Sequence, residues 1–216
     1  ISAGAPSFAS QRGRVGIFQF TDNSWTRMGQ FIEGVDANDE FGRAVSLSAD
    51  GEIVAIGAPG NDDDRDNRMD SKGTARVYQF NCVLANTNSC EDAWSLLGNG
   101  YEILGEYRFS DAGRNLALSE NGQTLVVHQE WSGDLRGRVQ AFKYLSDWHT
   151  AQYDSAWGRV ALNFLGNNGD LAGDDQGLAI SADGLTVGIG APYGGLNGFI
   201  NGCLLYTSDA ADDCRC

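Results

Sequence analysis

The sequence has little proline, little positive charge and no long hydrophobic run, and each shortage excludes a class of protein. Only 3 of the 216 residues are proline although 29 are glycine, which excludes a collagen-like chain and a proline-rich disordered chain. No stretch approaches the roughly 18 consecutive apolar residues of a membrane-spanning helix, so we expect no membrane span. The 15 Lys and Arg residues are outnumbered by 29 Asp and Glu residues, which gives a net charge of −14. So acidic a chain argues against a nucleic-acid partner and favours cations.

The two ends of the chain differ in character from its middle. From Cys203 onward the sequence reads CLLYTSDAADDCRC, which contains no glycine and resembles the translation of a sequencing adapter. We therefore expect residues 203–216 to be a non-native tail and leave them out of the fold prediction. Of the five cysteines, only Cys82 and Cys90 then remain. The N-terminus begins ISAGAPSF without an initiator methionine, so a signal peptide is neither visible nor excluded.

The middle of the chain contains internal repeats, whose landmarks keep the same order in each copy. The landmarks of the clearest copy are, in order, Phe41-Gly42, Ser48 to Gly51, Gly57-Ala58-Pro59, Phe80 and Trp94. A partial copy precedes it, beginning at Gly4, and another partial copy ends the pattern after Leu178. The preserved order indicates one structural unit repeated along the chain.

Two copies depart from this pattern. In the third copy Ala112-Gly113 stands for Phe-Gly, and His128-Gln129-Glu130 stands for Gly-Ala-Pro. In the last copy Gly177 lies four positions before Ser181, whereas six positions separate the corresponding residues of the clearest copy. We expect the loop of the last copy to be shortened or misaligned.

Each copy contains about four short runs of alternating apolar and polar residues, separated by glycine-rich turns. Asp50-Gly51 supplies the positive-φ pair of a tight hairpin, and the run from Ile53 to Ile56 is apolar throughout, as in a strand buried on both faces. Four antiparallel strands per copy predict an all-β fold made of β-propeller blades. We expect a partial blade over 1–34, blades over 35–105 and 106–166, and a partial blade over 167–202. About three blades are fewer than the roughly four to eight that close a propeller, so the sequence predicts an incomplete one.

Phe41-Gly42 followed by Gly57-Ala58-Pro59 is similar to the FG-GAP repeat, the blade unit of the β-propeller at the head of integrin α subunits. The resemblance covers about residues 1 to 202 and rests on the whole ordered set of landmarks. It implies a secreted or cell-surface protein that acts as an interaction or adhesion scaffold. Its ligand would be a protein or a glycan, which the fold does not identify.

An acidic loop follows Pro59 directly. Counted from Asp62, carboxylates occupy its first, third, fifth and ninth positions, namely Asp62, Asp64, Asp66 and Asp70, and Arg68 would contribute its backbone carbonyl at the seventh. Ca²⁺ takes roughly six to eight oxygen ligands, and alternate residues of a tightly curled loop can bring several of them together. The twelfth position is Gly73 instead of the glutamate of an EF-hand, and the loop resembles the calcium-binding hairpin loop of integrin α propellers. We predict a Ca²⁺ site here, and the alternative is a solvated acidic loop.

Cys82 and Cys90 flank a short polar loop between two expected strands. So short a ring suits a local disulfide, which would fit an oxidising, extracellular compartment, and two free thiols are the alternative.

The tryptophans of the repeats are typical of packing residues, and the two histidines do not indicate a catalytic site. Trp25, Trp94 and Trp157 occupy equivalent repeat positions, which favours packing between blades over a ligand-stacking surface. The two histidines, His128 and His149, lack the serine, cysteine or metal-ligand spacing of a catalytic site, so we expect both at the surface and expect no enzyme activity. The alternative function is a carbohydrate- or substrate-binding propeller module of a secreted enzyme.

Overall fold

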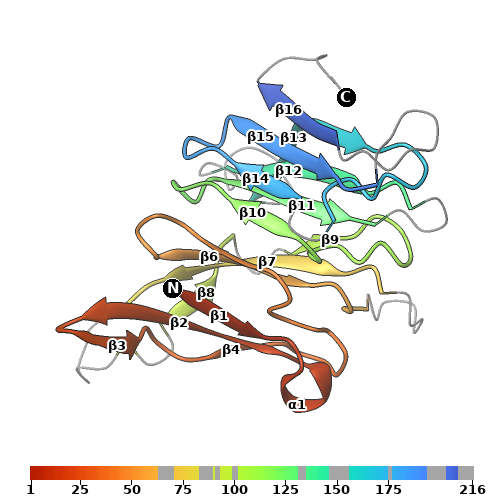
Figure 1. The fold of residues 1–216 in the computed structure, drawn as a ribbon. Coiled ribbons are helices and arrows are strands. Elements are labelled where there is room, and N and C mark those ends of the chain that lie inside the picture. The colour runs from red at the N-terminus through yellow and green to blue at the C-terminus, as the bar shows by residue number, and fades with distance from the viewer. Residues whose placement is uncertain are drawn as a thin grey trace.

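The computed structural model of the chain consists of four antiparallel β-sheets that follow one another in chain order (Figure 1). It describes residues 1–62, 71–82, 90, 93–98, 102–130, 135–145, 156–174 and 177–193, together with the backbone of 203–208; at 161–162 it likewise describes the backbone alone. In Figure 1 the N-terminal sheet, in red, lies at the bottom and the C-terminal sheet, in blue, at the top. This is the arrangement of consecutive propeller blades, so the predicted fold class is confirmed.

Each sheet is built from neighbouring segments of the chain. The first contains β1 (Ser2–Ala5), β2 (Arg14–Thr21), β3 (Ser24–Arg27) and β4 (Ile32–Glu33), with a single turn, α1 (Phe8–Gln11), after β1. The second contains β5 (Val45–Leu47), β6 (Ile53–Ala58), β7 (Thr74–Phe80), β8 (Trp94–Leu96) and β9 (Ile103–Leu104). The third contains β10 (Leu116–Leu118), β11 (Thr124–Gln129), β12 (Arg138–Tyr144) and β13 (Trp157–Leu165). The fourth contains β14 (Leu178–Ile180), β15 (Thr186–Ala191) and β16 (Cys203–Ser208).

The strand β6 is apolar throughout because its sheet lies between two others. Along β6, Val54 and Ile56 belong to the hydrophobic core that contains Val15 of the first sheet. Ala55 points to the other face and belongs to the core that contains Leu125 of the third sheet. Alternate residues of a strand point to opposite faces, so both sets of side chains are buried. The predicted burial of this strand on both faces is confirmed.

Equivalent backbone hydrogen bonds join each sheet to the next at the Phe-Gly landmark. They run from Phe41 N to Arg12 O at 3.2 Å, from Ala112 N to Lys72 O at 3.0 Å and from Ala172 N to Arg136 O at 3.0 Å. The glycine that follows each donor has a positive φ, namely Gly42 at 88°, Gly113 at 85° and Gly173 at 81°.

These bonds correct the alignment of the last copy. Its landmark is Ala172-Gly173, and Gly177 is a later residue. The segment from Gly173 to Ser181 is therefore two residues longer than its counterparts, so of the two expectations misalignment is right and shortening is wrong.

The glycine of the Gly-Ala-Pro landmark lies where two sheets approach most closely. A Cβ atom on Gly57 would collide with the backbone carbonyl of Gly113 in the third sheet, and one on Gly4 would collide with that of Gly42. A side chain is excluded at both positions, which is the physical reason for the glycine.

The Asp-Gly or Asn-Gly turns have the same hydrogen bonds in three sheets. Ser48 Oγ donates to Asp50 Oδ1 at 2.5 Å, Asp50 Oδ1 accepts from Glu52 N–H at 2.9 Å, and Ile53 N–H donates to Ser48 Oγ at 2.9 Å. The turns that begin at Ser119 and Ser181 repeat all three bonds. Only the glycine, Gly51, has a positive φ, so the predicted positive-φ pair is wrong. The side chain of Asp50 acts instead as an acceptor inside a longer turn, and its bond to Ser48 lowers the pKa of Asp50.

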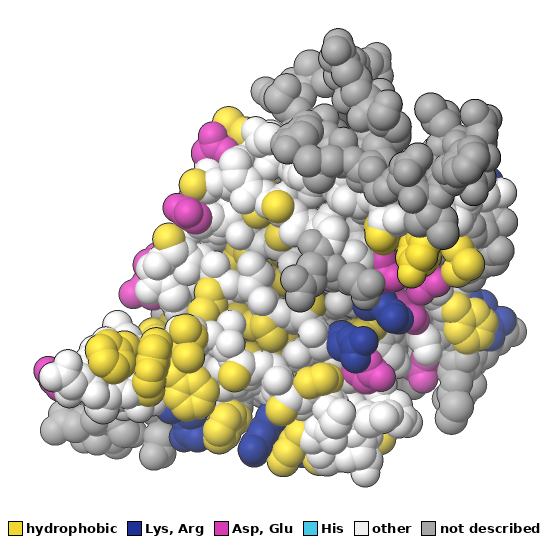
Figure 2. All heavy atoms as spheres, viewed as in Figure 1, with side chains coloured by type: hydrophobic (Ala, Val, Ile, Leu, Met, Phe, Trp, Pro, Cys, Tyr) yellow, Lys and Arg dark blue, Asp and Glu magenta, His cyan; other side chains and the backbone are white. Residues whose placement is uncertain are grey.

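An aromatic pair recurs in the first three sheets, with ring centroids 5.2 Å apart for Phe20–Trp25, 5.1 Å for Phe80–Trp94 and 5.5 Å for Tyr144–Trp157. Trp94 and Trp157 are only 5% and 3% exposed, which confirms their packing role. Trp25 is 54% exposed on the outer face of the first sheet, so the packing expectation is not met there. Figure 2 shows hydrophobic side chains gathered at the lower left, over this sheet.

The fourth sheet includes residues that the sequence analysis set aside as a tail. The backbone of β16 pairs antiparallel with β15, from Cys203 opposite Ala191 to Ser208 opposite Thr186. The non-native origin of 203–216 and the blade boundaries stay predictions. In the part of the chain that the structure describes, no helix has the length and apolar character needed to cross a membrane.

Candidate functional site

The acidic loop leaves the second sheet at the end of β6, and hydrogen bonds close its base. Asp62 Oδ1 accepts the Ser71 N–H at 2.6 Å. Gly73, the residue before β7, donates its N–H to Asn61 O at 2.9 Å. The two ends of the loop therefore meet at one point of the β6–β7 hairpin.

Residues of the connections before and after the second sheet hold this base in place. On one side the buried carboxylate of Asp39 accepts Asn61 Nδ2 at 3.2 Å, and Asp39 O accepts Gly60 N–H at 3.1 Å. On the other side Asp111 N–H donates to Ser71 O at 3.1 Å. The base of the acidic loop is thus hydrogen-bonded to the connection between the first and second sheets and to the connection between the second and third sheets.

The structure places one of the predicted calcium ligands. Asp62 lies at the base of the loop, whereas Asp64, Asp66, Arg68 and Asp70 lie outside the described residues. Within the described ranges, no group of three or more His, Cys, Asp and Glu side chains is arranged to hold a metal ion. The donor chemistry nevertheless fits Ca²⁺, because carboxylates are hard oxygen ligands, and the described residues on either side of the loop, Asp62 and Ser71, are hydrogen-bonded to each other.

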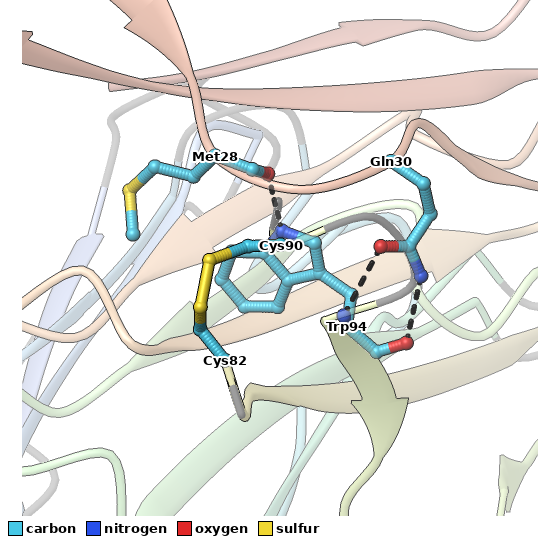
Figure 3. Close-up of a disulfide and its surroundings, with 5 residues drawn as sticks. All are labelled: Met28, Gln30, Cys82, Cys90 and Trp94. Atoms are coloured by element: carbon cyan, nitrogen blue, oxygen red, sulfur yellow. Dashed lines mark hydrogen bonds between the residues drawn. A yellow bond between two sulfur atoms is a disulfide. The ribbon is translucent and has the colours of Figure 1, made fainter. Parts of the chain in front are cut away.

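The structure joins Cys82 and Cys90 in a disulfide, with their Cα atoms 5.2 Å apart. Figure 3 shows this bond beside Trp94, Met28 and Gln30. Trp94 Nε1–H donates to Met28 O at 2.7 Å. The Gln30 amide donates to Trp94 O at 2.9 Å and accepts from Trp94 N–H at 3.1 Å. The disulfide therefore ties the β7–β8 connection at the place where the second sheet packs on the first.

Replacing both cysteines, Cys82→Ser together with Cys90→Ser, is expected to lower the free energy of unfolding by about 2–3 kcal/mol. The reason is that the bond closes a loop of nine residues and so restricts the unfolded chain. Chemical denaturation under non-reducing conditions measures the change. Cys203→Ser is the matched control, because it removes a thiol and leaves the bond intact. Equal stabilities of the double variant and the control would contradict the prediction.

The third copy carries a buried histidine that sequence reasoning missed. His128 is fully buried, so the expectation of a surface histidine is wrong for it, and His149 lies outside the described residues. The backbone N–H of His128 donates to Asn115 O at 3.0 Å, just as the backbone N–H of Gly57 donates to Ala44 O at 2.9 Å. His128 therefore occupies the glycine position of the Gly-Ala-Pro landmark. The sequence signal for this burial was the departure from Gly-Ala-Pro itself, because a side chain that replaces the glycine must fit between two sheets.

Charged side chains flank His128 at the junction of the third and fourth sheets. Arg114 Nε lies 3.3 Å from Asp174 Oδ1, and Arg114 Nη1 lies 3.6 Å from Asp111 Oδ2. Burial is the main reason that the pKa of His128 is lowered to about 4; Asp174 acts against this shift and Arg114 acts with it. Burial, together with Asp111, also raises the pKa of Glu130. Near neutral pH the imidazole is therefore uncharged.

Gln129 forms a polar network on the opposite face of β11. Gln129 Nε2 donates to Gln140 Oε1 at 2.8 Å, and Gln140 Nε2 donates to Glu106 Oε1 at 3.2 Å. The Glu106 carboxylate also pairs with Arg138 and Arg159. Burial would raise the pKa of Glu106, but the hydrogen bond from Gln140 and the two arginines outweigh it and lower that pKa. Because its members satisfy one another, we assign this network to packing.

Stacked antiparallel sheets with recurring glycine junctions, serine-capped turns and aromatic pairs define a repeat protein of the β-propeller type. Residues 33–78 match the family model described as the FG-GAP repeat. This segment runs from the end of the first sheet through the Phe41-Gly42 landmark, the Asp50 turn and the acidic loop into β7. Residues 33–78 thus form an FG-GAP repeat, which confirms the resemblance found in the sequence. A comparison with curated proteins found no match.

Proposed function

We propose that the chain is a Ca²⁺-stabilised β-propeller module that acts outside the cell or at the cell surface as a protein-interaction or adhesion scaffold. The observation that carries the proposal is the acidic loop. Four of its carboxylates stand at its first, third, fifth and ninth positions, its base is closed by Asp62 and Ser71, and it directly follows the Gly-Ala-Pro landmark of the FG-GAP repeat. The proposal includes no catalytic activity.

The loop would hold the ion through four carboxylates and one backbone carbonyl, those of Asp62, Asp64, Asp66, Asp70 and Arg68. Without a cation these like charges repel one another, which opposes a compact loop. A bound Ca²⁺ offsets the repulsion. Because the base of the loop is hydrogen-bonded to residues of both junctions, we expect the ion to stabilise the sheets on either side as well.

Two observations support a location outside the cell or at the cell surface. The disulfide between Cys82 and Cys90 suits an oxidising compartment. The FG-GAP match supports the resemblance to the extracellular propellers of integrin α subunits.

Adding Ca²⁺ to the protein is expected to raise its melting temperature. At a free concentration a hundredfold above the dissociation constant, an ion that binds only the folded state contributes about 2.7 kcal/mol. For a chain of this size that corresponds to an increase of roughly 5–10 °C. Differential scanning calorimetry in CaCl₂ and in EDTA measures the difference, and Asp64→Ala is expected to abolish it.

Glu52→Ala is the matched control, because it removes one exposed carboxylate from the same sheet at a position outside the loop. It should keep the full response to Ca²⁺. An unchanged melting temperature of the wild-type protein in millimolar Ca²⁺ would overturn the calcium part of the proposal. A response that survives Asp64→Ala would move the ion to another site.

The scaffold role is separated from the alternative by what the protein binds. A carbohydrate-binding module would use exposed aromatic rings, and Phe20 and Trp25, each 54% exposed, are the ones available on the first sheet. The equivalent rings of the next two sheets are packed at junctions, which favours a packing surface. We expect Ca²⁺-dependent binding to immobilised extracellular proteins and none on a glycan array. Binding to glycans alone, together with their cleavage, would support the alternative.

A further inference from the structure

The junction between the third and fourth sheets is built differently from the two that precede it. At those two junctions a glycine of one sheet lies against a glycine of the next, Gly4 against Gly42 and Gly57 against Gly113. At the third junction His128 replaces the first glycine of the pair, opposite Gly173. An imidazole therefore stands where the other junctions exclude even a methyl group.

The facing segment is lengthened at the same place. In the second sheet two positions separate Gly42 from Ala44, which accepts the Gly57 N–H. In the fourth sheet four positions separate Gly173 from Gly177, which accepts the Gly190 N–H. His128 Cδ2 lies 3.2 Å from the point where a Cβ atom of residue 173 would stand, so the imidazole packs directly against this segment. The histidine and the longer spacing from Gly173 to Gly177 therefore both distinguish this junction from the two before it.

Among the described residues, the imidazole has no hydrogen-bond partner at this junction. It is fully buried, and neither Nδ1 nor Nε2 has a hydrogen-bond partner among the described residues. The elements packed around Gly173 present the apolar side chains of Val139 and Leu178 beside it.

The charges that act on His128 come from both sheets. Asp174 approaches from the fourth sheet and Arg114 from the third, and these two are paired with each other. Asp111 also pairs with Arg114, and Glu130 follows His128 by two residues and interacts with the same three charged groups. Arg114 thus pairs with two of these carboxylates, Asp174 and Asp111, and its own positive charge opposes protonation of the imidazole.

We propose that His128 makes this junction acid-labile, so that the third and fourth sheets separate locally, before the other sheets, as the pH falls. In the open junction the imidazole meets water and takes up a proton readily, whereas in the closed junction it stays neutral. Protonation therefore favours the open form.

The direction and size of this pH effect follow from the pKa of His128 in the closed junction and in the open one. The pKa of His128 is lowered to about 4 in the closed protein, against about 6.5 for an exposed histidine. The stabilisation is fully present above pH 6.5 and is lost as the pH falls from there toward 4. The opening constant is expected to rise about 30-fold between pH 7.5 and pH 5.0.

Hydrogen exchange followed by mass spectrometry at pH 7.5 and pH 5.0, corrected for the intrinsic exchange chemistry, tests the proposal. The apparent opening constant should rise about 30-fold in peptides from β11 and from β14–β15, and much less in peptides from β6. In His128→Gln, which cannot titrate, the acid response of these peptides should disappear while that of β6 stays as it was. His149→Gln, which changes the other histidine, should behave as the wild type.

A second measurement does not depend on the variant being folded. The imidazole resonance of His128 in the wild-type protein, assigned by NMR, should remain that of a neutral ring at pH 5. Titration of this resonance between pH 6 and 7 would overturn the proposal. So would an equal acid response in all sheets, or a response of β14–β15 that persists in His128→Gln.

Discussion

Gly57→Ala is expected to lower the free energy of unfolding by about 3 kcal/mol or more, although it adds a single methyl group. The new Cβ atom would collide with the carbonyl of Gly113, which belongs to the backbone of the next sheet and cannot rotate away. The two sheets would have to separate locally, and this would expose part of the core that contains Ala55, Leu116 and Leu125. Urea denaturation measures the loss.

Gly188→Ala is the matched control, because Gly188 also lies in a central strand, in β15. Among the described residues, an added Cβ there would meet Ala179, at 3.8 Å, which is an ordinary van der Waals distance. Its stability should stay within about 1 kcal/mol of the wild type, on the stabilising side, because alanine restricts the unfolded chain more than glycine does. Equal losses for the two variants would contradict the account of the glycine junctions.

The repeat pattern was predictable from the sequence because each landmark reports a local constraint. Glycine at position 57 marks a close backbone approach, and the apolar run from Ile53 to Ile56 marks a strand between two layers. Trp94 and Trp157 share one place in the repeat and one packing role. Constraints of this kind are visible in one chain because the repeats can be compared with one another.

The environment of His128 could not be predicted in the same way. Its burial depends on the position of the fourth sheet, and the length of the segment after Gly173 decides whether an imidazole fits. Local sequence carries no record of that spatial pairing. The side chain of Asp50 gives a second example, since Asp-Gly alone indicates a two-residue hairpin, and only the bonds to Ser48 and Glu52 define the longer turn.

Calcium binding was predicted from spacing, and the structure adds the hydrogen bond that closes the base of the acidic loop. The bond from Ser71 to Asp62 could not be read from the run of carboxylates, because it joins residues on either side of the loop. Asp64, Asp66 and Asp70 lie outside the described residues, so these ligands stay predictions.

Trp94→Ala is expected to lower the free energy of unfolding by about 3–5 kcal/mol, the range for truncating a large buried aromatic side chain. Trp94 is only 5% exposed and packs in the core shared by the first two sheets, with Val15 and Ile17. The substitution would also leave Met28 O without the indole N–H that it accepts at 2.7 Å. Equilibrium denaturation measures the change.

The most direct test of stacked, equivalent sheets compares Trp94→Ala with Trp25→Ala in one denaturation series. The two tryptophans hold the same place in successive copies and pack on equivalent aromatic rings, Phe80 and Phe20, but Trp25 is 54% exposed. The account predicts a loss of about 3–5 kcal/mol for Trp94→Ala and at most about 1 kcal/mol for Trp25→Ala. Similar losses for the two variants would show that the sheets do not pack on one another in this way.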